Sequence, residues 1–569
     1  MVTTIARTLE LSLGTGRRTD QFLARETPGN VGVALSGGGS RACVAGLGQL
    51  RALRELGLLG QVRALSGVSG GAWLTAAWTF LPDDRDDAGF FGRVVAPEAL
   101  VLHAAAGEDP ARAITEVPEG CFARAICDGS FGPVGLLASG HRALMRGVDM
   151  RDRWSHAVGE ILFGPIGLHH VDEHGRPTAF FAADAEAAAE ARRHNPWLES
   201  VRALTVHARA GDAPRPFAIL NTGFVATDHA GASASVPVQG TPYFVGTVST
   251  PPAVDRRGEA IGGGGVLPFS YGGSLVGVGE GSPRPVEVAL ERVYGLHDIV
   301  GCSSAFYADK VVALTPAHPL VPEYKRYRPG SAAPAGGRDF FVDGGALENT
   351  GVAALLAWSD IERLIVFVNA PRPLEVAYHG MAMVERQVPP LFGYRPFVPG
   401  LGYRPYAGID APTLASGTHL TSELLGALPE PLDPVATGFR NNAVFAPEAF
   451  PELLSGLLRR AKAGGDAPGV GPCAYLQRGV PVIDNPWHGV AGGRSVDVLW
   501  VLLSPASQRL DRLRPEVAAA RHHTWPHYAT GSTHLSPQDA NLLSQFTGWV
   551  VGELRPELEV LFGRTNVLK

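Results

Sequence analysis

The sequence predicts an α/β fold with a central, mostly parallel sheet, helices on both faces, and long cap or lid insertions. Three observations predict it. An apolar run, a glycine turn and an apolar helical pattern follow one another twice between residues 31 and 81, which is the order of a parallel sheet covered by helices. Two further apolar runs, at 364–368 and 498–503, are typical of buried strands. Hydrophobic residues make up 45% of the 569 residues, which is enough for a large core.

The first strand–turn–helix unit covers residues 31–57. Residues 31–35 (Val-Gly-Val-Ala-Leu) predict a buried strand, because a short apolar run that ends in a glycine turn is typical of one. Leu50 and Leu53 then belong to a series of apolar residues at near-helical spacing, and Gly57 ends the predicted helix.

The second unit covers residues 62–81. Residues 62–65 predict a short strand, and the turn Ser-Gly-Val-Ser-Gly-Gly follows at 66–71. Residues 72–81 are apolar and prone to form a helix. Pro82 ends that predicted helix, because proline cannot continue one.

The rest of the chain is interpreted as part of the same domain, because no clean linker separates it. Further strands are expected at 217–220, 243–248, 311–314 and 340–342. The expected organisation is an N-terminal extension at 1–30, a single α/β domain at 31–550 with insertions at about 83–200 and 371–490, and a C-terminal tail at 551–569.

Charge and cysteine use exclude several classes of protein. The net charge is −6, whereas a nucleic-acid-binding protein would show a basic surplus. None of the lysines closes a Gly-x-x-x-x-Gly-Lys loop, which excludes a P-loop nucleotide hydrolase. Five cysteines without a Cys-x-x-Cys pair are typical of a reducing compartment. With no apolar run of signal-peptide length and none long enough for a transmembrane helix, we expect a cytoplasmic protein, with peripheral membrane contact still open.

Residues 67–71 fit the pattern Gly-x-Ser-x-Gly, with Ser69 at the centre. A serine hydroxyl acts as a nucleophile only when it is held out from the backbone and given a base. A tight turn from strand to helix holds it out, and flanking glycines allow the strained backbone. The predicted strand before the turn and the apolar helix after it supply this context, so Ser69 is the candidate nucleophile.

Three consecutive glycines, Gly37, Gly38 and Gly39, lie between the first predicted strand and helix. One interpretation is a plain turn. The other is an oxyanion hole, because glycine amides are unobstructed, and one such donor stabilises a transition state by about 3 kcal/mol. Arg41 opens the next helix, either as a solvated surface residue or as a group that grips a phosphate through its planar fork.

A carboxylate ends the predicted strand at 340–342. Asp343 is followed by two glycines, a sequence also common in plain turns, but it stands at the end of a sheet strand, where α/β sites are built. An unperturbed aspartate has a pKa of about 3.9 and is a feeble base at neutral pH. We hypothesise that Asp343 lies in a largely apolar pocket, indicated by Phe340, Phe341 and Val342, and that burial raises its pKa.

Together these motifs resemble the patatin-like lipid hydrolases. The motifs are Ser-Gly-Gly-Gly-Ser-Arg at 36–41, Gly-Val-Ser-Gly-Gly at 67–71 and Val-Asp-Gly-Gly at 342–345. In order and spacing they look most similar to the branch of cytosolic phospholipase A2 and phospholipase B, a lysophospholipase. Weaker similarities extend the resemblance over most of the chain, at 241–246, 301–306, 526–530 and 535–543.

The resemblance implies a three-layer acyl hydrolase fold and a Ser–Asp dyad in place of a triad. Ser69 matches the nucleophile and Asp343 the base, Gly38 and Gly39 match the oxyanion donors, and Arg41 matches the arginine that contacts the phospholipid phosphate. The implied activity is hydrolysis of carboxylic esters of phospholipids or lysophospholipids through an acyl-enzyme, without a cofactor or a metal. Acyl-chain and positional preference and oligomeric state are not determined.

Two features depart from that branch. The serine turn Gly-Val-Ser-Gly-Gly is the patatin form, whereas the eukaryotic cytosolic enzymes carry Gly-Leu-Ser-Gly-Ser. The first 30 residues have no room for the calcium-binding membrane module of some relatives, so calcium-driven membrane recruitment is not expected.

Two other functions stay open. A Ser–His–Asp esterase or lipase on neutral esters needs a histidine after the acid in the sequence, and candidates are His522, His523, His527 and His534. A catalytically silent lipid-binding scaffold is the second alternative, although the intact Ser69 and Asp343 argue against it.

Histidine groups and apolar stretches give the remaining expectations. The groups His169, His170, His174 and His522, His523, His527 are placed like metal ligands, but neither has the His-Glu-x-x-His spacing, and no metal is expected. For membrane contact, the candidates are the Pro/aromatic segment 389–407 and the basic amphipathic stretch 453–462. The alternative is that both pack internally as cap elements.

Overall fold

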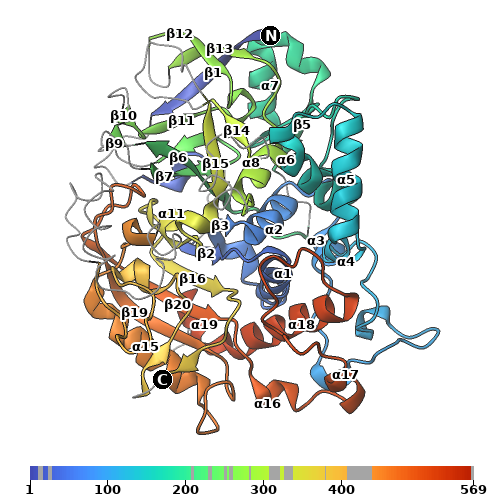
Figure 1. Cartoon of the computed structure of the whole chain (residues 1–569), viewed down its shortest axis with the longest axis vertical. Coiled ribbons are helices and arrows are strands. Elements are labelled where there is room, and N and C mark those ends of the chain that lie inside the picture. The colour runs from blue at the N-terminus through green and yellow to red at the C-terminus, as the bar shows by residue number, and fades with distance from the viewer. Residues whose placement is uncertain are drawn as a thin grey trace.

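The computed structural model describes residues 1–10, 17–23, 29–206, 211–227, 233–248, 253–254, 260–280, 284–306, 321–325, 338–377, 380–406 and 439–564. Within these ranges, one mixed sheet of 14 strands runs through the molecule (Figure 1). From one edge to the other its strands are β12 (Ser274–Val278), β13 (Pro285–Leu290), β1 (Val2–Glu10), β11 (Gly264–Val266), β8 (Val245–Thr247), β7 (Ser233–Gly240), β6 (Phe217–Thr227), β3 (Val62–Val68), β2 (Val31–Leu35), β16 (Arg363–Val368), β20 (Arg494–Leu502) and β19 (Ala474–Val482). The short strand β14 (Glu323–Tyr324) pairs with β15 (Asp339–Asp343), which pairs with β6.

The centre of the sheet is parallel. Strands β6, β3, β2, β16 and β20 pair in parallel with one another, in that order. Leu35 at the end of β2 lies beside Gly67 of β3, and Gly67 lies beside Leu220 of β6. The carboxyl ends of these strands therefore meet at one edge of the sheet, where the loops that follow β2 and β3 lie together.

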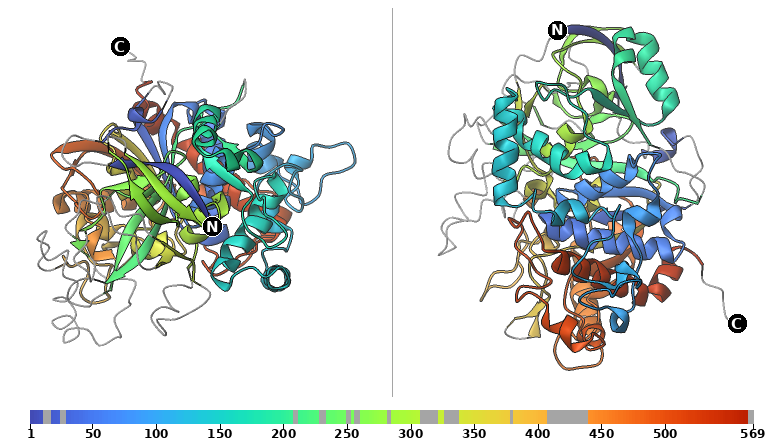
Figure 2. Two further views of the ribbon diagram at one scale, coloured as in Figure 1. Left: turned by 90° about the horizontal axis from the view of Figure 1, so that it is seen from above. Right: turned by 90° about the vertical axis from the view of Figure 1, so that its right-hand side faces the viewer.

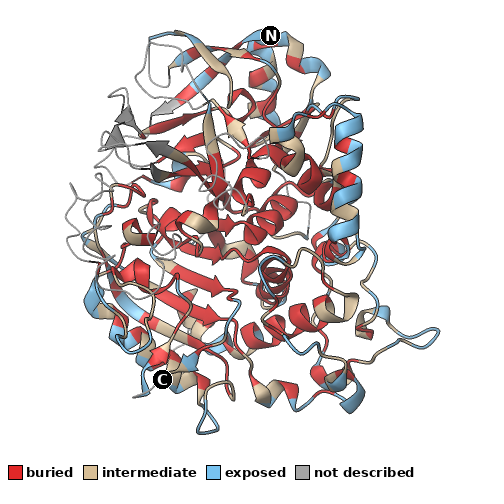
Figure 3. Cartoon of the chain, viewed as in Figure 1, coloured by how far each residue is buried: buried red, intermediate tan, exposed pale blue. Residues whose placement is uncertain are grey.

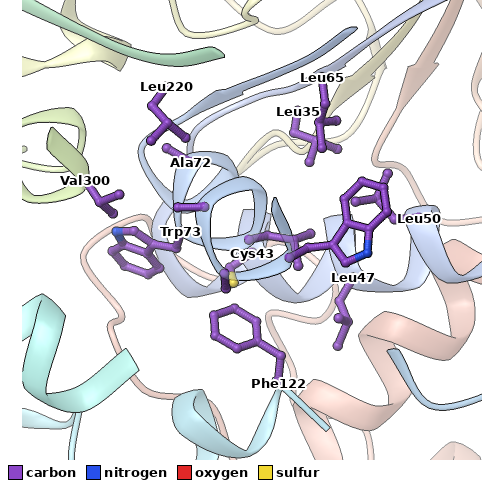
Figure 4. Packing of buried hydrophobic residues seen from close by; sticks show 14 of the residues in the cluster. Leu35, Cys43, Leu47, Leu50, Leu65, Ala72, Trp73, Phe122, Leu220 and Val300 are labelled. Atoms are coloured by element: carbon purple, nitrogen blue, oxygen red, sulfur yellow. The ribbon is translucent and has the colours of Figure 1, made fainter. Parts of the chain in front are cut away.

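Side chains of the central strands alternate between two cores, one on each face of the sheet. In β2, Val33 and Leu35 face one core and Ala34 faces the other. The first core also holds α1 (Gly39–Glu55), α2 (Gly70–Thr79) and α18 (Pro537–Glu553), as Figure 4 shows for α1 and α2. The second holds α11 (Val352–Leu356) and α15 (Phe450–Ala461). The predicted α/β class, with a mostly parallel centre and helices on both faces, is confirmed.

Helix α1 is clamped between the sheet and α18. Gly48 allows close contact, because a Cβ at that position would lie 1.9 Å from the carbonyl O of Ser544 on α18. Nearby, Thr547 donates its hydroxyl to the carbonyl O of Ala45 at 2.9 Å. This packing holds the start of α1, and with it the glycine loop at 37–39, against a rigid helix.

Residues 83–200 form mostly short helices outside the large sheet, here called the cap (Figure 2). The cap includes α5 (Pro133–Met145), α6 (Arg153–Val158) and α7 (Ala185–His194). It also holds β4 (Ala179–Ala182), which pairs in parallel with β5 (Arg202–Thr205) outside the large sheet. None of the helices in the described ranges combines the length and the apolar character needed to cross a membrane.

The structure corrects the expected limits of the domain at both ends. The supposed N-terminal extension contains β1, which pairs with β13 and β11 inside the main sheet. Thr4 and Thr8 occupy two of the inward positions of β1, so the sequence lacks the clear alternation of apolar and polar residues that predicts a strand. At the other end, residue 550 lies within α18, and Leu558 and Leu561 of α19 (Arg555–Leu561) are each 1% exposed. The expected strand at 311–314 lies outside the described residues.

Candidate active site

Ser69 occupies a strained turn between β3 and α2. Its backbone has φ 50° and ψ −118°, and among the described residues it is the one non-glycine residue with positive φ. Such a conformation costs on the order of 1–3 kcal/mol and persists only where the surroundings enforce it. It is the sharp turn from strand to helix that a Gly-x-Ser-x-Gly nucleophile requires.

The next residue can only be glycine. A Cβ on Gly70 would lie 2.0 Å from the carbonyl O of Gly39. The turn that carries Ser69 is therefore in direct contact with the glycine loop that follows β2. Two segments that are separate in the sequence form one site because β2 and β3 are neighbours in the sheet.

Asp343 reaches Ser69 from a third segment. It ends β15, which pairs antiparallel with β6 so that Asp343 lies opposite Thr222. Strand β6 is the parallel neighbour of β3, which brings the end of β15 to the Ser69 turn. Ser69 Oγ donates a hydrogen bond to Asp343 Oδ2 at 3.0 Å, and each residue is 5% exposed.

The environment of Asp343 makes its carboxylate a stronger base. Burial raises the pKa of Asp343 to about 7, because an ionised carboxylate loses hydration in an apolar site. Two hydrogen bonds act in the opposite direction: the backbone N–H of Gly345 donates to Oδ1 at 2.7 Å, and Ser69 donates to Oδ2. Phe341 and Val342 before it are buried, and Phe340 is partly buried, in agreement with the apolar pocket hypothesised from the sequence.

The glycine loop runs past Ser69. A Cβ on Gly37 would lie 3.1 Å from the Cβ of Ser69. Gly38 and Gly39 have φ of 139° and 60°, values that favour glycine. Because Gly38 caps α1 and Gly39 is its first residue, their N–H groups have no acceptor within the helix and lie at its positive end. Such groups can stabilise an anion that develops beside Ser69.

Arg41 does not face open space, which differs from the position expected for a phosphate ligand. It is 1% exposed. Its Nε donates to the carbonyl O of Asn369 at 3.0 Å, its Nη1 to the carbonyl O of Tyr528, and its Nη2 to the hydroxyl of Thr530 at 3.3 Å. Burial lowers the pKa of Arg41 to about 10. The guanidinium thus ties the segment around 528–530 to the start of α1, next to Gly39.

Ser303 is a residue at this site to which the sequence assigned no role. It ends α8 (Leu296–Ser303), and its Oγ accepts the backbone N–H of Ser69 at 3.0 Å and donates to the carbonyl O of Asn221 at 2.6 Å. Asn221 in turn donates to Ser66 Oγ and to the carbonyl O of Gly67. The pattern at 301–306 stood out only as a weak family similarity, and no local feature shows that α8 ends beside the Ser69 turn.

The histidines required by the triad alternative make their hydrogen bonds elsewhere. Nδ1 of His527 contacts the carbonyl O of Ala370 at 3.0 Å, and burial lowers the pKa of His527 to about 4. His534 contacts the carbonyl O of Ile126, and His522 contacts Thr524 and lies against the tilted ring of His523. The observed partner of Ser69 Oγ is Asp343.

The two histidine groups singled out in the sequence do not converge as ligands. His169 lies between the rings of His156 and His297, His170 contacts the carbonyl O of Gly167, and His174 lies beside Glu173. The described part of the chain contains no group of three or more His, Cys, Asp or Glu side chains that could hold a metal ion.

The two segments expected to contact a membrane are both partly packed into the second core. In 389–406, Leu391 and Phe392 are fully buried in the second core. In α15, Leu453 and Leu457 are buried in the same core, and its other leucines pack against it. Much of the apolar surface of both segments is therefore used for folding, which is the alternative raised from the sequence, whereas Leu401 in the first segment is 44% exposed. Residue 407 lies outside the described ranges.

The chain matches no protein-family model and no curated protein sequence. Among solved structures it is similar to human GIVD cytosolic phospholipase A2, with 14% identity, 95% of this chain and 62% of that chain covered, and a TM-score of 0.44. The same human protein in complex with methyl γ-linolenyl fluorophosphonate gives 13% identity, 95% and 60% coverage, and a TM-score of 0.40. VipD from Legionella pneumophila gives 13% identity, 60% and 50% coverage, and a TM-score of 0.19. This chain thus spans less than two thirds of the length of these proteins, and its function is inferred from the geometry of its own site.

Proposed function

We propose that this protein is a lipid acyl hydrolase that cleaves carboxylic esters of phospholipids or lysophospholipids through a Ser–Asp dyad. The observation that carries the proposal is the 3.0 Å hydrogen bond from Ser69 Oγ to the buried Asp343 carboxylate, whose pKa is raised to about 7. A buried base of this strength, in contact with a serine on a strained turn, is what nucleophilic catalysis needs near neutral pH.

The first half of the proposed reaction acylates Ser69. Asp343 takes the proton of the Ser69 hydroxyl as the oxygen attacks the ester carbonyl carbon. The carbonyl oxygen becomes an oxyanion, which the N–H groups of Gly38 and Gly39 stabilise. The intermediate collapses, the acyl bond to the leaving alcohol breaks, and Asp343 returns the proton to that alcohol. The product is an acyl-enzyme on Ser69.

The second half releases the fatty acid. Water takes the place of the alcohol, and Asp343 removes its proton during attack on the acyl carbon. The same glycine amides stabilise the second oxyanion. Collapse breaks the bond to Ser69 Oγ, which regains its proton from Asp343. One carboxylate thus serves as base and acid in both halves, and no step requires a histidine.

We propose a phospholipid and not a neutral ester as the substrate because the three sequence motifs resemble those of the patatin-like lipid hydrolases. Because Arg41 is buried and already donates to three protein oxygens, we do not assign the head-group phosphate to it in this conformation. Its proposed role here is to hold the segment around 528–530 beside the oxyanion loop. A role in phosphate binding would require that segment to move.

Labelling with a fluorophosphonate tests the chemistry directly, because this reagent phosphonylates an activated serine hydroxyl. We expect the wild-type chain to be labelled at Ser69, Ser69→Ala not to be labelled, and Asp343→Asn to be labelled far more slowly. The labelled peptide is identified by mass spectrometry, and release of fatty acid from phosphatidylcholine and lysophosphatidylcholine is measured in parallel. A wild-type chain that neither reacts nor releases fatty acid would instead be the silent lipid-binding scaffold.

A further inference from the structure

Helix α5 in the cap turns its apolar side chains outward. Val134, Leu137, Leu144 and Met145 are 81%, 76%, 54% and 74% exposed. Their spacing places them on one face of the helix, together with His141. An ordinary surface helix buries its apolar face against the core, so the orientation of α5 is the reverse of the usual one. Figure 3 shows the exposed colour along the helix, and Figures 1 and 2 place it at the outside of the molecule.

The inward side of α5 combines one apolar contact with small and polar residues: Leu136 is partly buried and packs against the first core. The buried residues of α5 are Ser139 and Ala143. Ser139 Oγ donates to Glu160 Oε2 at 2.5 Å, and Arg142 Nε donates to Glu160 Oε1 at 2.8 Å. Leu136 and these polar contacts therefore hold the helix on the rest of the cap, while the four outward apolar side chains stay in water. Scattered exposed apolar residues need no explanation, but a row of them on one helix face marks an interaction surface.

The charge of this region indicates the kind of partner. Residues 133–148 contain no Asp or Glu, although the whole chain has a net charge of −6. The basic or titratable residues in this stretch are His141, Arg142 and Arg146, and all three are exposed. Arg142 is already paired with Glu160, which leaves Arg146 as the arginine of this stretch for an anionic partner. An exposed apolar helix face with an arginine at its end and no carboxylate in the same stretch is suited to the interface of an anionic bilayer; here that arginine is Arg146, the C-cap of α5.

Aromatic side chains connect α5 to the active site. Phe131, just before α5, lies edge-on to Trp73 of α2, with ring centroids 5.1 Å apart. Trp154 stacks on Phe131 at 6.1 Å and donates its Nε1–H to Ser304 Oγ at 3.3 Å. Helix α2 begins directly after Ser69, and Ser304 follows the last residue of α8. A membrane surface that binds α5 would therefore lie against a helix that is packed, through these aromatic side chains, on the elements around Ser69.

We propose that the exposed face of α5, formed by Val134, Leu137, His141, Leu144 and Met145, docks onto the interface of a bilayer that contains anionic phospholipid. The apolar side chains enter the interface and Arg146 contacts a phosphate group. A second copy of the chain fits less well, because pairing two such faces brings basic residues together without an acidic residue on α5 to meet them. The purpose of this docking rests on the proposed function, but vesicle binding is measured without turnover.

Vesicle co-sedimentation tests the surface in the full chain carrying Ser69→Ala, so that lipid is not consumed. The vesicles are phosphatidylcholine alone, or phosphatidylcholine mixed with phosphatidylserine. In this background, the triple variant Val134→Gln, Leu137→Gln, Met145→Gln is expected to bind the mixed vesicles at least about tenfold more weakly, because it loses most of the apolar area that enters the interface. Glutamine is a good helix former, so circular dichroism and the melting temperature are expected to be unchanged.

A matched control replaces exposed apolar residues on an element other than α5. Val276 and Val278 on β12 are 57% and 42% exposed, and their replacement by glutamine is expected to leave binding unchanged. Arg146→Gln is expected to weaken binding to the mixed vesicles by about fivefold and to leave binding to pure phosphatidylcholine unaltered. When the triple variant is made in a chain that keeps Ser69, we expect it to hydrolyse a dissolved short-chain ester as fast as wild type. We expect it to hydrolyse vesicle lipid more slowly than wild type does.

Three outcomes would overturn the proposal. One is equal vesicle binding by the parent and the triple variant. Another is binding that the β12 control reduces as much as the triple variant does. The third is a dimer in light scattering that the triple variant dissociates, without vesicle binding, since α5 would then pack against a second copy. Absence of ester hydrolysis would refute the proposed function instead, and would leave the vesicle result standing.

Discussion

Ser303 holds the backbone of Ser69 in place: its hydroxyl oxygen accepts the Ser69 N–H at 3.0 Å. The hydroxyl proton of Ser303 goes to the carbonyl O of Asn221 at 2.6 Å, which leaves a lone pair directed at Ser69. The N–H of Ser69 is therefore already engaged. In the proposed mechanism this leaves the amides of Gly38 and Gly39 to stabilise the oxyanion.

Replacing Ser303 by alanine should lower kcat about 10- to 100-fold with little change in KM. The variant leaves the buried N–H of Ser69 without an acceptor, which costs about 1–3 kcal/mol and relaxes the strained turn. Steady-state kinetics on a dissolved ester separate the two constants. Ser303→Thr keeps the hydroxyl and should recover most of the rate; a rise in KM alone, or no rescue by threonine, would contradict a positioning role.

The rate of acylation should fall as the pH drops below about 7. Asp343 must be ionised to accept the Ser69 proton, and its pKa is raised to about 7 by burial. The pH dependence of kcat/KM is expected to show one acidic limb with that midpoint, falling about tenfold per pH unit. Infrared titration of the buried carboxyl group should give the same midpoint.

A histidine that acted as the base would give a similar acidic limb in the pH dependence of kcat/KM. Variants of the candidate histidines are therefore the control for this prediction. Alanine variants of His522, His523, His527 and His534, made one at a time, are expected to keep the limb and the burst of acyl-enzyme. Loss of the burst in any one of them would favour the Ser–His–Asp alternative.

Asp343→Asn should abolish activity and yet stabilise the fold at alkaline pH. The pKa of Asp343 is raised from 3.8 to about 7 in the folded chain, so the folded state binds this proton more tightly than the unfolded state does. The stability of the wild type therefore falls as the pH rises from about 4 to 7, and the full cost, about 4 kcal/mol, is present above pH 7.

The asparagine side chain cannot ionise and avoids this cost. Urea unfolding at pH 8 should show the variant to be more stable than wild type, with the advantage shrinking as the pH approaches about 4. Equal stabilities at pH 8 would show that the Asp343 carboxylate is not destabilised by burial.

Arg41→Ala should lower hydrolysis of a phospholipid and of an uncharged ester by the same factor. Removing the guanidinium leaves the carbonyls of Asn369 and Tyr528 without their donors, which we expect to cost about 2–4 kcal/mol of stability and to loosen the segment beside the oxyanion loop. Parallel assays on the two substrates and a melting curve measure this. A loss confined to the phospholipid would return Arg41 to the phosphate-binding role implied by the resemblance.

Local sequence patterns were sufficient where a residue acts within its own segment. The runs at 31–35 and 364–368 are strands because both of their faces are buried, and continuous apolar sequence records this directly. The turn at Ser69 was predictable because glycines on both sides allow a backbone that other residues resist. Strand β1 could not be predicted, because Thr4 and Thr8 occupy inward positions. The alternation of apolar and polar residues that is typical of a strand is therefore weak in this segment.

The sequence by itself was enough to single out Ser69, Asp343 and the glycine loop as candidates, since each lies in a short pattern with its own chemistry, and their roles remain a prediction. Only the tertiary structure decided how they meet and what surrounds them: the pairing of β15 with β6 that places Asp343 on Ser69, the burial of Arg41, the contact from Ser303, and the outward face of α5. The physical reason is that hydrogen-bond partners and solvent exposure depend on segments hundreds of residues apart, whereas a sequence pattern records only the preferences of neighbouring residues.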